Sequence, residues 1–248
     1  MTQGPVAFCD LDDSLFQTRP KCPEDEVEGL RLMSRLDDGS PSGYATVRQQ
    51  AFLAWLRAGQ IVPVTARGRS VLARVDIEQA PAICANGGCI IDADGAIDRA
   101  WHDRLVDEGR QATPVGEVHA EFTGGLSADY RHWIVSEDGL DLYVVIKSNS
   151  GDAAALAALG ARLGAALPPG WRMHANSNNL ALLPGWLNKR HAVAYLIDRV
   201  RAENPGVPLI GVGDSLSDAG FMDLCDFAVT PTNSQLWSAA THGNVWLA

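Results

Sequence analysis

The residues with the clearest chemical potential form an acidic cluster near the N-terminus. Asp10, Asp12 and Asp13 lie within four positions, directly after the apolar run at residues 5–9. Such a run predicts a strand buried on both faces of a parallel sheet, and ligand sites of these sheets lie beyond the carboxyl ends of strands. Clustered carboxylates repel one another unless a cation or a proton neutralises them, and their hard oxygen atoms indicate Mg²⁺.

Three later segments offer polar side chains at similar places. Thr65 follows one apolar run, Asp214 and Asp218 follow another, and Lys189 begins a predicted amphipathic helix. Each has an ordinary alternative: acidic strand ends also occur in receiver-type domains, a threonine can cap a helix, and a helix-start lysine can be solvated. Together these positions supply carboxylates, a hydroxyl and an ammonium group, which can bind a cation and a phosphoryl group.

Composition excludes several classes of protein. The net charge of −10 lacks the basic footprint of a protein that binds nucleic acid or an anionic membrane. No apolar stretch approaches the roughly 18 residues of a membrane span. The first residues show no signal-peptide pattern, and the five cysteines are odd in number without CxxC spacing. We therefore expect a cytoplasmic protein with buried, reduced thiols and neither a nucleic-acid nor a membrane partner.

The elements expected on either side of the chain's middle follow α/β order. Strand-like apolar runs alternate with helical patterns, which is typical of a parallel sheet. Residues 17–45, rich in Gly, Pro, Ser and Asp, are expected to be irregular, and 89–98 to form a small hairpin. We expect strands at 5–9, 61–64, 82–85, 208–213 and within 223–229, and helices at 46–58, 70–75 and 189–202.

The pattern changes between residues 97 and 184. We expect an α+β insertion with strands at 142–146, 171–174 and 180–183 and a helix at 152–167. The predicted fold class is therefore α/β, with a Rossmann-like parallel sheet in a core domain of residues 1–96 and 185–248 and an inserted α+β domain at 97–184.

The order of the polar motifs resembles that of the haloacid dehalogenase (HAD) superfamily. The segment Asp10–Ser14 is similar to its first motif, DxDx[ST], and Gly213–Asp218 to its fourth, GDSxxD. Thr65 and Lys189 stand where the second and third motifs occur. The insertion lies where superfamily phosphatases carry a C2-type cap, and Asn86-Gly87-Gly88 resembles the segment leading into it. The resemblance is nearest to the type IIB branch, which is Cof-like and sucrose-phosphatase-like.

The resemblance implies a role for each motif residue. Asp10 would attack phosphorus to form an aspartyl-phosphate, and Asp12 would act as general acid and base. Mg²⁺ would be held by Asp10, the backbone carbonyl of Asp12 and Asp214, with Asp218 orienting Lys189 or a metal-bound water. Thr65 and Lys189 would bind the phosphoryl oxygens. Two departures from the pattern are Asp13, where glycine is usual, and Arg190-His191 after Lys189, where a small residue is common.

Further side chains are candidates for substrate binding, each with a simpler alternative. Arg67 and Arg69 can be solvated, Asn86 can be a turn residue, and the polar run around His174 to Asn179 in the insertion can be a turn. The candidates for substrate contact are Ser14, Arg67, Asn86, Gly87, Asn178 and Asn233.

These expectations define an enzyme that hydrolyses a phosphoric monoester. The predicted function is a Mg²⁺-dependent phosphatase acting on a small phosphorylated metabolite, a sugar or sugar-acid phosphate, under a closing cap. A phosphomutase of the same superfamily and a non-catalytic phosphometabolite-binding protein remain as alternatives. The substrate is undetermined by the sequence, and either a monomer or a homodimer is compatible with it.

Overall fold

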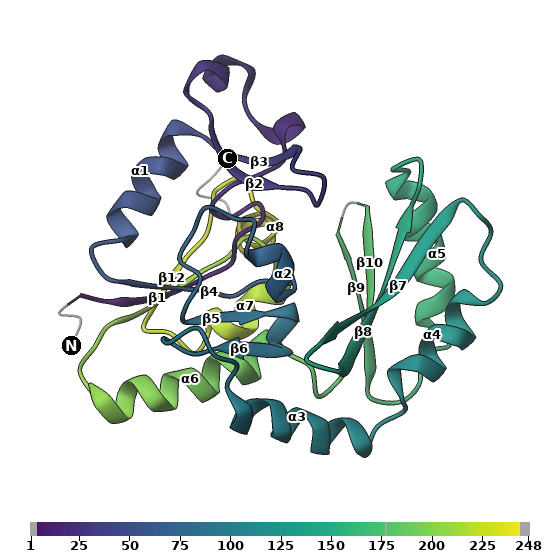
Figure 1. Ribbon diagram of the computed structural model, residues 1–248. Coiled ribbons are helices and arrows are strands. Elements are labelled where there is room, and N and C mark those ends of the chain that lie inside the picture. The colour runs from purple at the N-terminus through teal and green to yellow at the C-terminus, as the bar shows by residue number, and fades with distance from the viewer. Residues whose placement is uncertain (1–3, 177, 244–248) are drawn as a thin grey trace. The chain divides into compact units, whose positions relative to one another are not determined.

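The computed structural model describes residues 4–176 and 178–243, which divide into two compact units. The first unit comprises the chain up to Asp98 and again from Lys189, and the second runs from Arg99 to Asn188 (Figure 1). No helix in the described ranges is long and apolar enough to cross a membrane.

The first unit is built on a parallel sheet in the order β12 (Phe227–Val229), β11 (Leu209–Val212), β1 (Val6–Cys9), β4 (Gln60–Pro63). Strand β1 is central, since it pairs in parallel with both β11 and β4, and all four of its residues are buried. This explains why its sequence is apolar without alternation. The predicted Rossmann-like sheet is confirmed.

A short hairpin extends this sheet. Val64 forms a parallel bridge with Ile83 of β5 (Ala82–Cys84), and β5 pairs antiparallel with β6 (Cys89–Ile91). Within the hairpin expected at 89–98, the structure has one antiparallel bridge, between Ile91 and Ile97. The main partner of β6 is the preceding strand β5.

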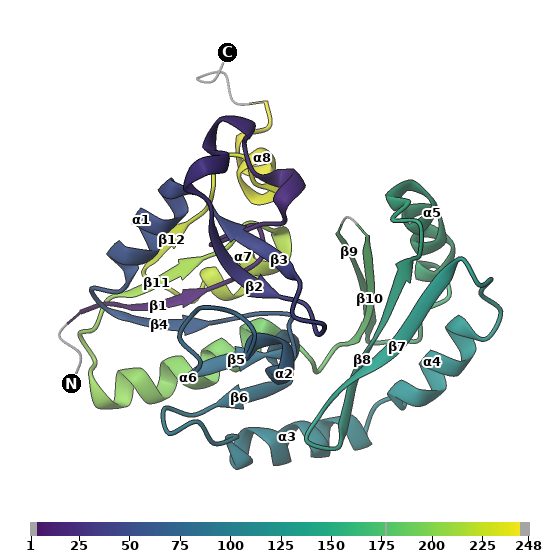
Figure 2. The same cartoon turned by 45° about the horizontal axis from the view of Figure 1, so that its top comes forward.

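Helices cover both sides of the parallel sheet. Figures 1 and 2 show α1 (Val47–Leu56) and α6 (Lys189–Glu203) on opposite sides of it. Thr46 and Gln49 form a reciprocal capping box that fixes the start of α1. The remaining helices of this unit are α2 (Arg69–Leu72), α7 (Leu216–Met222), α8 (Gln235–Thr241) and the 3₁₀ turns η1 (Arg19–Lys21), η2 (Glu24–Gly29) and η3 (Ala85–Gly87).

The expectation of irregular structure over residues 17–45 is wrong. The segment contains an antiparallel hairpin of β2 (Arg31–Arg35) and β3 (Pro41–Ala45), whose register shifts near Ser34. Gly43 in β3 packs where an added Cβ would lie 2.4 Å from the Ser34 hydroxyl and 2.8 Å from the Phe16 ring. A close approach of this kind requires glycine, so the residues that suggested a loop serve a strand.

The second unit is an antiparallel sheet with helices on one side. Its strands lie in the order β7 (Tyr130–Glu137), β8 (Leu140–Ser148), β10 (Asn179–Pro184), β9 (Trp171–Asn176) (Figure 2). Helices α4 (Val115–Thr123) and α5 (Ala153–Gly164) pack against Val144, Ile146 and Leu180. The sequence predicted a helix and three strands here but missed β7, α4 and α3 (Arg99–Arg110).

Candidate active site

Two neighbouring strands carry the acidic side chains to one edge of the parallel sheet. Asp10 directly follows β1, and its backbone N–H donates to the carbonyl oxygen of Val212 at the end of β11 at 2.8 Å. Asp214 lies two residues after Val212, the last residue of β11. Both side chains are buried. The carboxyl edge of the sheet is therefore where the two motifs meet, as parallel pairing requires.

Lys189 joins this edge from the first residue of α6. Its Nζ donates to Oδ1 of Asp10 at 2.7 Å and to Oδ1 of Asp218 at 2.8 Å. All three side chains are at least nine-tenths buried. Burial opposes the charge on the ammonium group, but the two carboxylates outweigh it and raise the pKa of Lys189. The lysine is therefore a fixed cation between two segments of chain.

Asp218 is held on its other oxygen by the start of its own helix. The hydroxyl and the backbone N–H of Ser215 donate to Oδ2 of Asp218 at 2.6 and 3.1 Å. Burial raises the pKa of Asp218, but Lys189 and these hydrogen bonds more than compensate, so the pKa is lowered. Ser215 had no assigned role in the sequence, although the Ser-x-x-Asp spacing of a capping box would have indicated this contact.

The carboxylates of Asp10, Asp214 and Asp218 form a group that can hold a metal ion. One oxygen from each lies within 4.8 Å of the others. Burial raises the pKa of Asp214 to about 6, with the charges of Asp218 and Asp13 adding to the effect. Burial likewise raises the pKa of Asp10, against the opposing charge of Lys189. One ammonium group leaves this trio with excess negative charge, so its donors fit a hard divalent cation such as Mg²⁺.

The ligand atoms within this trio are not equivalent. Both oxygens of Asp218 already accept hydrogen bonds, from Lys189 and from Ser215. Oδ2 of Asp10 and Oδ1 of Asp214 have only a long hydrogen bond from the Ser14 hydroxyl, at 3.2 and 3.5 Å. Asp10 and Asp214 are therefore the better placed side-chain ligands.

The side chain of Asp12 is not part of this trio and pairs with an arginine. Its two carboxylate oxygens accept hydrogen bonds from Nε and Nη2 of Arg67, both at 2.7 Å. Burial lowers the pKa of Arg67, but the hydrogen bonds and charge of Asp12 and the charge of Asp10 raise it overall. Metal contact through the backbone carbonyl of Asp12 remains a prediction.

Thr65 and the loop of Asn86 lie beside each other. Thr65 is buried after β4, and its Oγ1 accepts a hydrogen bond from the backbone N–H of Arg67 at 3.1 Å. The backbone N–H of Asn86 donates to the carbonyl of Thr65 at 3.0 Å. Asn86 is left-handed with φ of 59°, and Gly87 follows at φ of 96°. Asn86 thus has the turn role that the sequence allowed, within reach of the second motif.

Asp13 occupies a backbone conformation that explains the departure from the motif pattern. Its φ of 62° lies in the left-handed region, which glycine adopts freely and aspartate tolerates better than most residues. Lys21 pairs with its carboxylate at 2.5 Å. Lys21 of η1 thus compensates part of the extra negative charge beside the site.

The remaining candidates have contacts with other parts of their own units. Asn178 accepts from the backbone N–H of Ser148 and donates to its carbonyl, both at 2.9 Å, so it ties the β9–β10 turn to β8. Asn233 is exposed in the turn before α8, whose Leu236 N–H donates to the carbonyl of Asp214. Arg190 bonds Asp223 and the carbonyl of Gly220 on α7. The side chain of Asn176 and residue Ser177 lie outside the described structure.

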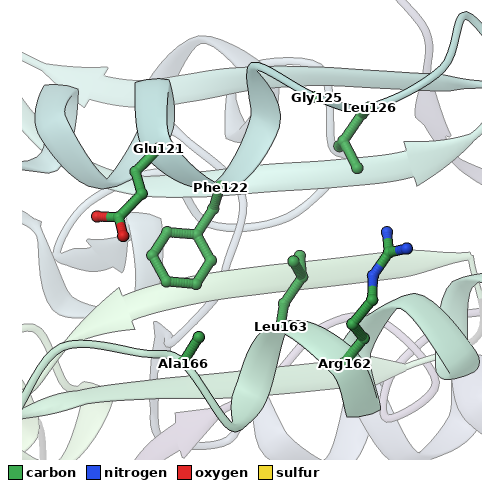
Figure 3. A pocket seen from close by; sticks show the side chains of 7 residues that line it. All are labelled: Glu121, Phe122, Gly125, Leu126, Arg162, Leu163 and Ala166. Carbon is green, nitrogen blue, oxygen red and sulfur yellow. The ribbon is translucent and has the colours of Figure 1, made fainter.

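The second unit contains a cavity of different character. It has a volume of about 340 Å³ and lies between α4 and α5, lined mainly by apolar side chains (Figure 3). Glu121 and Arg162 are its charged lining residues. It contains none of the motif residues.

No family model matches the sequence, and no curated protein does so. Solved structures show the fold. Sucrose-phosphatase from Synechocystis, in complex with sucrose and phosphate, superposes with a TM-score of 0.57 at 16% identity, over 99% of this chain and 89% of that one. A haloacid dehalogenase-like hydrolase from B. subtilis gives 0.51 at 14% identity, over 95% and 92%. A Thermoplasma acidophilum protein gives 0.51 at 16% identity, over 96% and 88%.

The chain therefore has the fold of the HAD-like hydrolases, a parallel α/β core with an inserted α+β unit. The sequence resemblance to this class is confirmed at the level of fold.

Proposed function

We propose that this protein is a Mg²⁺-dependent phosphatase that hydrolyses a small phosphorylated metabolite through an aspartyl-phosphate. The observation that carries the proposal is the buried ammonium of Lys189 held between Asp10 and Asp218, beside Asp214. A cation, a nucleophilic carboxylate and a metal-binding group thus meet at the carboxyl edge of a HAD-like sheet.

Asp10 is the nucleophile in this proposal. One of its oxygens accepts from Lys189 and the other from Ser14, so the carboxylate is oriented from two sides. A nucleophile must be ionised, and burial works against this by raising the pKa of Asp10. Lys189 favours the ionised form, and Mg²⁺ bound by Asp10 and Asp214 would supply further neutralising charge and orient the phosphoryl group.

The reaction divides into two displacements. In the first, an Asp10 oxygen bonds to phosphorus while the bond to the ester oxygen breaks, and Asp12 gives its proton to the departing oxygen. In the second, water attacks phosphorus, the bond to Asp10 breaks, and Asp12 takes the proton of the water. Lys189 and the Thr65 hydroxyl bind the phosphoryl oxygens, on which negative charge is spread.

A phosphorylated sugar or sugar acid is the proposed substrate class. The likeness to a sucrose-phosphatase supports it at the level of fold. We further propose that the inserted unit acts as a cap, excluding bulk water from the phosphorylated Asp10 and contributing selectivity.

The test is a phosphate-release screen over sugar, nucleotide and glycerate phosphates, with Mg²⁺ and with EDTA. Asp10→Asn should abolish release that the natural protein shows with Mg²⁺. Asp76→Asn, which removes an exposed carboxylate of the same unit, is the matched control and should leave release unchanged. Full activity of Asp10→Asn would refute the covalent mechanism.

The two alternatives give different results in the same screen. A phosphomutase would return the phosphoryl group to substrate, so little phosphate labelled with ¹⁸O from water would be released. A non-catalytic binding protein would release no phosphate from any ester while still binding one of them.

A further inference from the structure

The contact between Arg67 and Asp12 has features of a built positioning device. Both nitrogens of the guanidinium fork lie 2.7 Å from the two oxygens of one carboxylate. Bidentate pairing fixes orientation as well as distance, which a single lysine contact does not. The Asp12 side chain is half exposed, whereas only 18% of the Arg67 side chain is exposed. The arginine is therefore the anchored partner.

The anchoring of Arg67 comes from three sides. Its backbone N–H donates to the Thr65 hydroxyl at 3.1 Å, and its carbonyl accepts from the backbone N–H of Ala85 at 2.8 Å. Its guanidinium lies over the Phe16 ring at 5.3 Å from the centroid. The arginine is thereby connected to the loop after β4, to the start of η3 and to the segment after Ser14.

The contact also fixes how the atoms of Asp12 are engaged. Arg67 is the donor in both hydrogen bonds and each Asp12 oxygen is an acceptor, so the contact orients Asp12 through its acceptor atoms. Accepting a proton is the role that Asp12 has in the second displacement of the proposed reaction.

Resting on the proposed function, we propose that Arg67 is a positioning residue for hydrolysis of the aspartyl-phosphate. It holds the Asp12 carboxylate where it accepts a proton from the attacking water. In that step the oxygen of water bonds to phosphorus, the bond from phosphorus to Asp10 breaks with its electron pair returning to the Asp10 carboxylate, and the proton passes to Asp12. Arg67 is thus assigned to Asp12 and not to the substrate, in contrast to the sequence-based expectation.

The test separates the two displacements with p-nitrophenyl phosphate, whose phenolate leaves without a proton. In Arg67→Gln with Mg²⁺, the first displacement should remain fast and the second should slow. We expect a rapid burst of p-nitrophenolate approaching one equivalent of protein, followed by turnover reduced about 10- to 100-fold. Turnover of alkyl phosphates should fall to the same steady rate, because the shared hydrolytic step limits both.

Three further measurements control this result. Arg67→Lys keeps the charge but loses the fork, so its turnover should lie between those of the natural protein and Arg67→Gln. Arg57→Gln removes another arginine–carboxylate pair, to Glu78, from the same unit and should change neither burst nor turnover. Adding Asp12→Asn to Arg67→Gln should slow hydrolysis less than the two single losses multiplied together, since both act through one contact.

Several outcomes would overturn the assignment. Unchanged turnover of Arg67→Gln would show that Asp12 needs no such support. A loss confined to esters with poor leaving groups would place Arg67 in the first displacement. A rise in KM with unchanged kcat would make Arg67 a substrate-binding residue. Failure of the proposed function is distinct, because then the natural protein itself would release no p-nitrophenolate.

Discussion

Replacing Lys189 by methionine tests how the buried charges depend on one another. The substitution keeps the side-chain length but removes the ammonium group that bridges Asp10 and Asp218. Two hydrogen bonds between charged groups are lost, at about 1.5–3 kcal/mol each. Removing one partner of a buried ion pair costs about 3–5 kcal/mol, which agrees with that range. We therefore expect the free energy of unfolding to fall by about 4 kcal/mol.

Thermal unfolding gives the measurement. For a chain of this size, such a loss corresponds to a Tm lower by about 8–16 °C. Mg²⁺ should raise the Tm of Lys189→Met more than that of the natural protein, because a second cation compensates carboxylates left unpaired. In the folded state the pKa of Lys189 is raised above its ordinary value of 10.5. The charge of Lys189 therefore stabilises the fold fully at pH 7, and this contribution is lost only as the pH rises above 10.5.

Lys21→Met is the matched control, since Lys21 pairs with Asp13 but is 46% exposed. Exposed ion pairs contribute about 0–1 kcal/mol, so its Tm should change by no more than about 4 °C. If Lys189→Met behaved like Lys21→Met, or if Mg²⁺ stabilised it no more than the natural protein, the account of the buried cluster would be wrong.

Three further predictions concern the metal, the fourth motif and a helix start. Calorimetric titrations should show Mg²⁺ binding about tenfold more weakly for each pH unit below 6, because Asp214 has a pKa of about 6 and must lose its proton to bind the metal. Equal affinity at pH 5 and pH 7 would contradict this. Gly213→Ala should lower the free energy of unfolding by about 1–3 kcal/mol and reduce phosphate release, since the added Cβ would lie 2.5 Å from the Cβ of Asp218. Gly206→Ala is the control, because an added Cβ has open space there, and it should change neither stability nor phosphate release. Thr46→Ala should lower the free energy of unfolding by about 0.5–2 kcal/mol through loss of the α1 cap, with kcat unchanged; an altered kcat would show that this helix start affects the site.

The sequence predicted the sheet and the meeting of its motifs because both depend on local pattern. A wholly apolar run ending in carboxylates could be recognised in β1, and the first residue of α6 is Lys189, as expected. The hairpin β2–β3 was missed because Gly43 and its neighbours resemble a loop until Phe16, distant in sequence, packs on them. Strand β7 was missed because its exposed and half-buried residues include Arg131 and His132, and its pairing with β8 is non-local.

Within the site, the sequence identified residue types but not their partners. Arg67 was expected either to contact substrate or to be solvated, and its bidentate contact with Asp12, 55 positions away, has no local signal. Asn178 was predicted to bind substrate, and the hydrogen bonds of its amide with the backbone of Ser148 on another strand had no local signal. Contacts across such distances follow from tertiary packing, which a single sequence does not specify.

The most direct test of the central claim is to trap the phosphorylated protein. The natural protein, mixed with substrate and Mg²⁺ and quenched in acid within milliseconds, should carry one phosphoryl group on the peptide that contains Asp10 by mass spectrometry. The group should be lost on treatment with hydroxylamine, as acyl phosphates are, and should be absent from Asp10→Asn. Phosphate released by the natural protein without any such adduct, or with the adduct on another residue, would contradict the account.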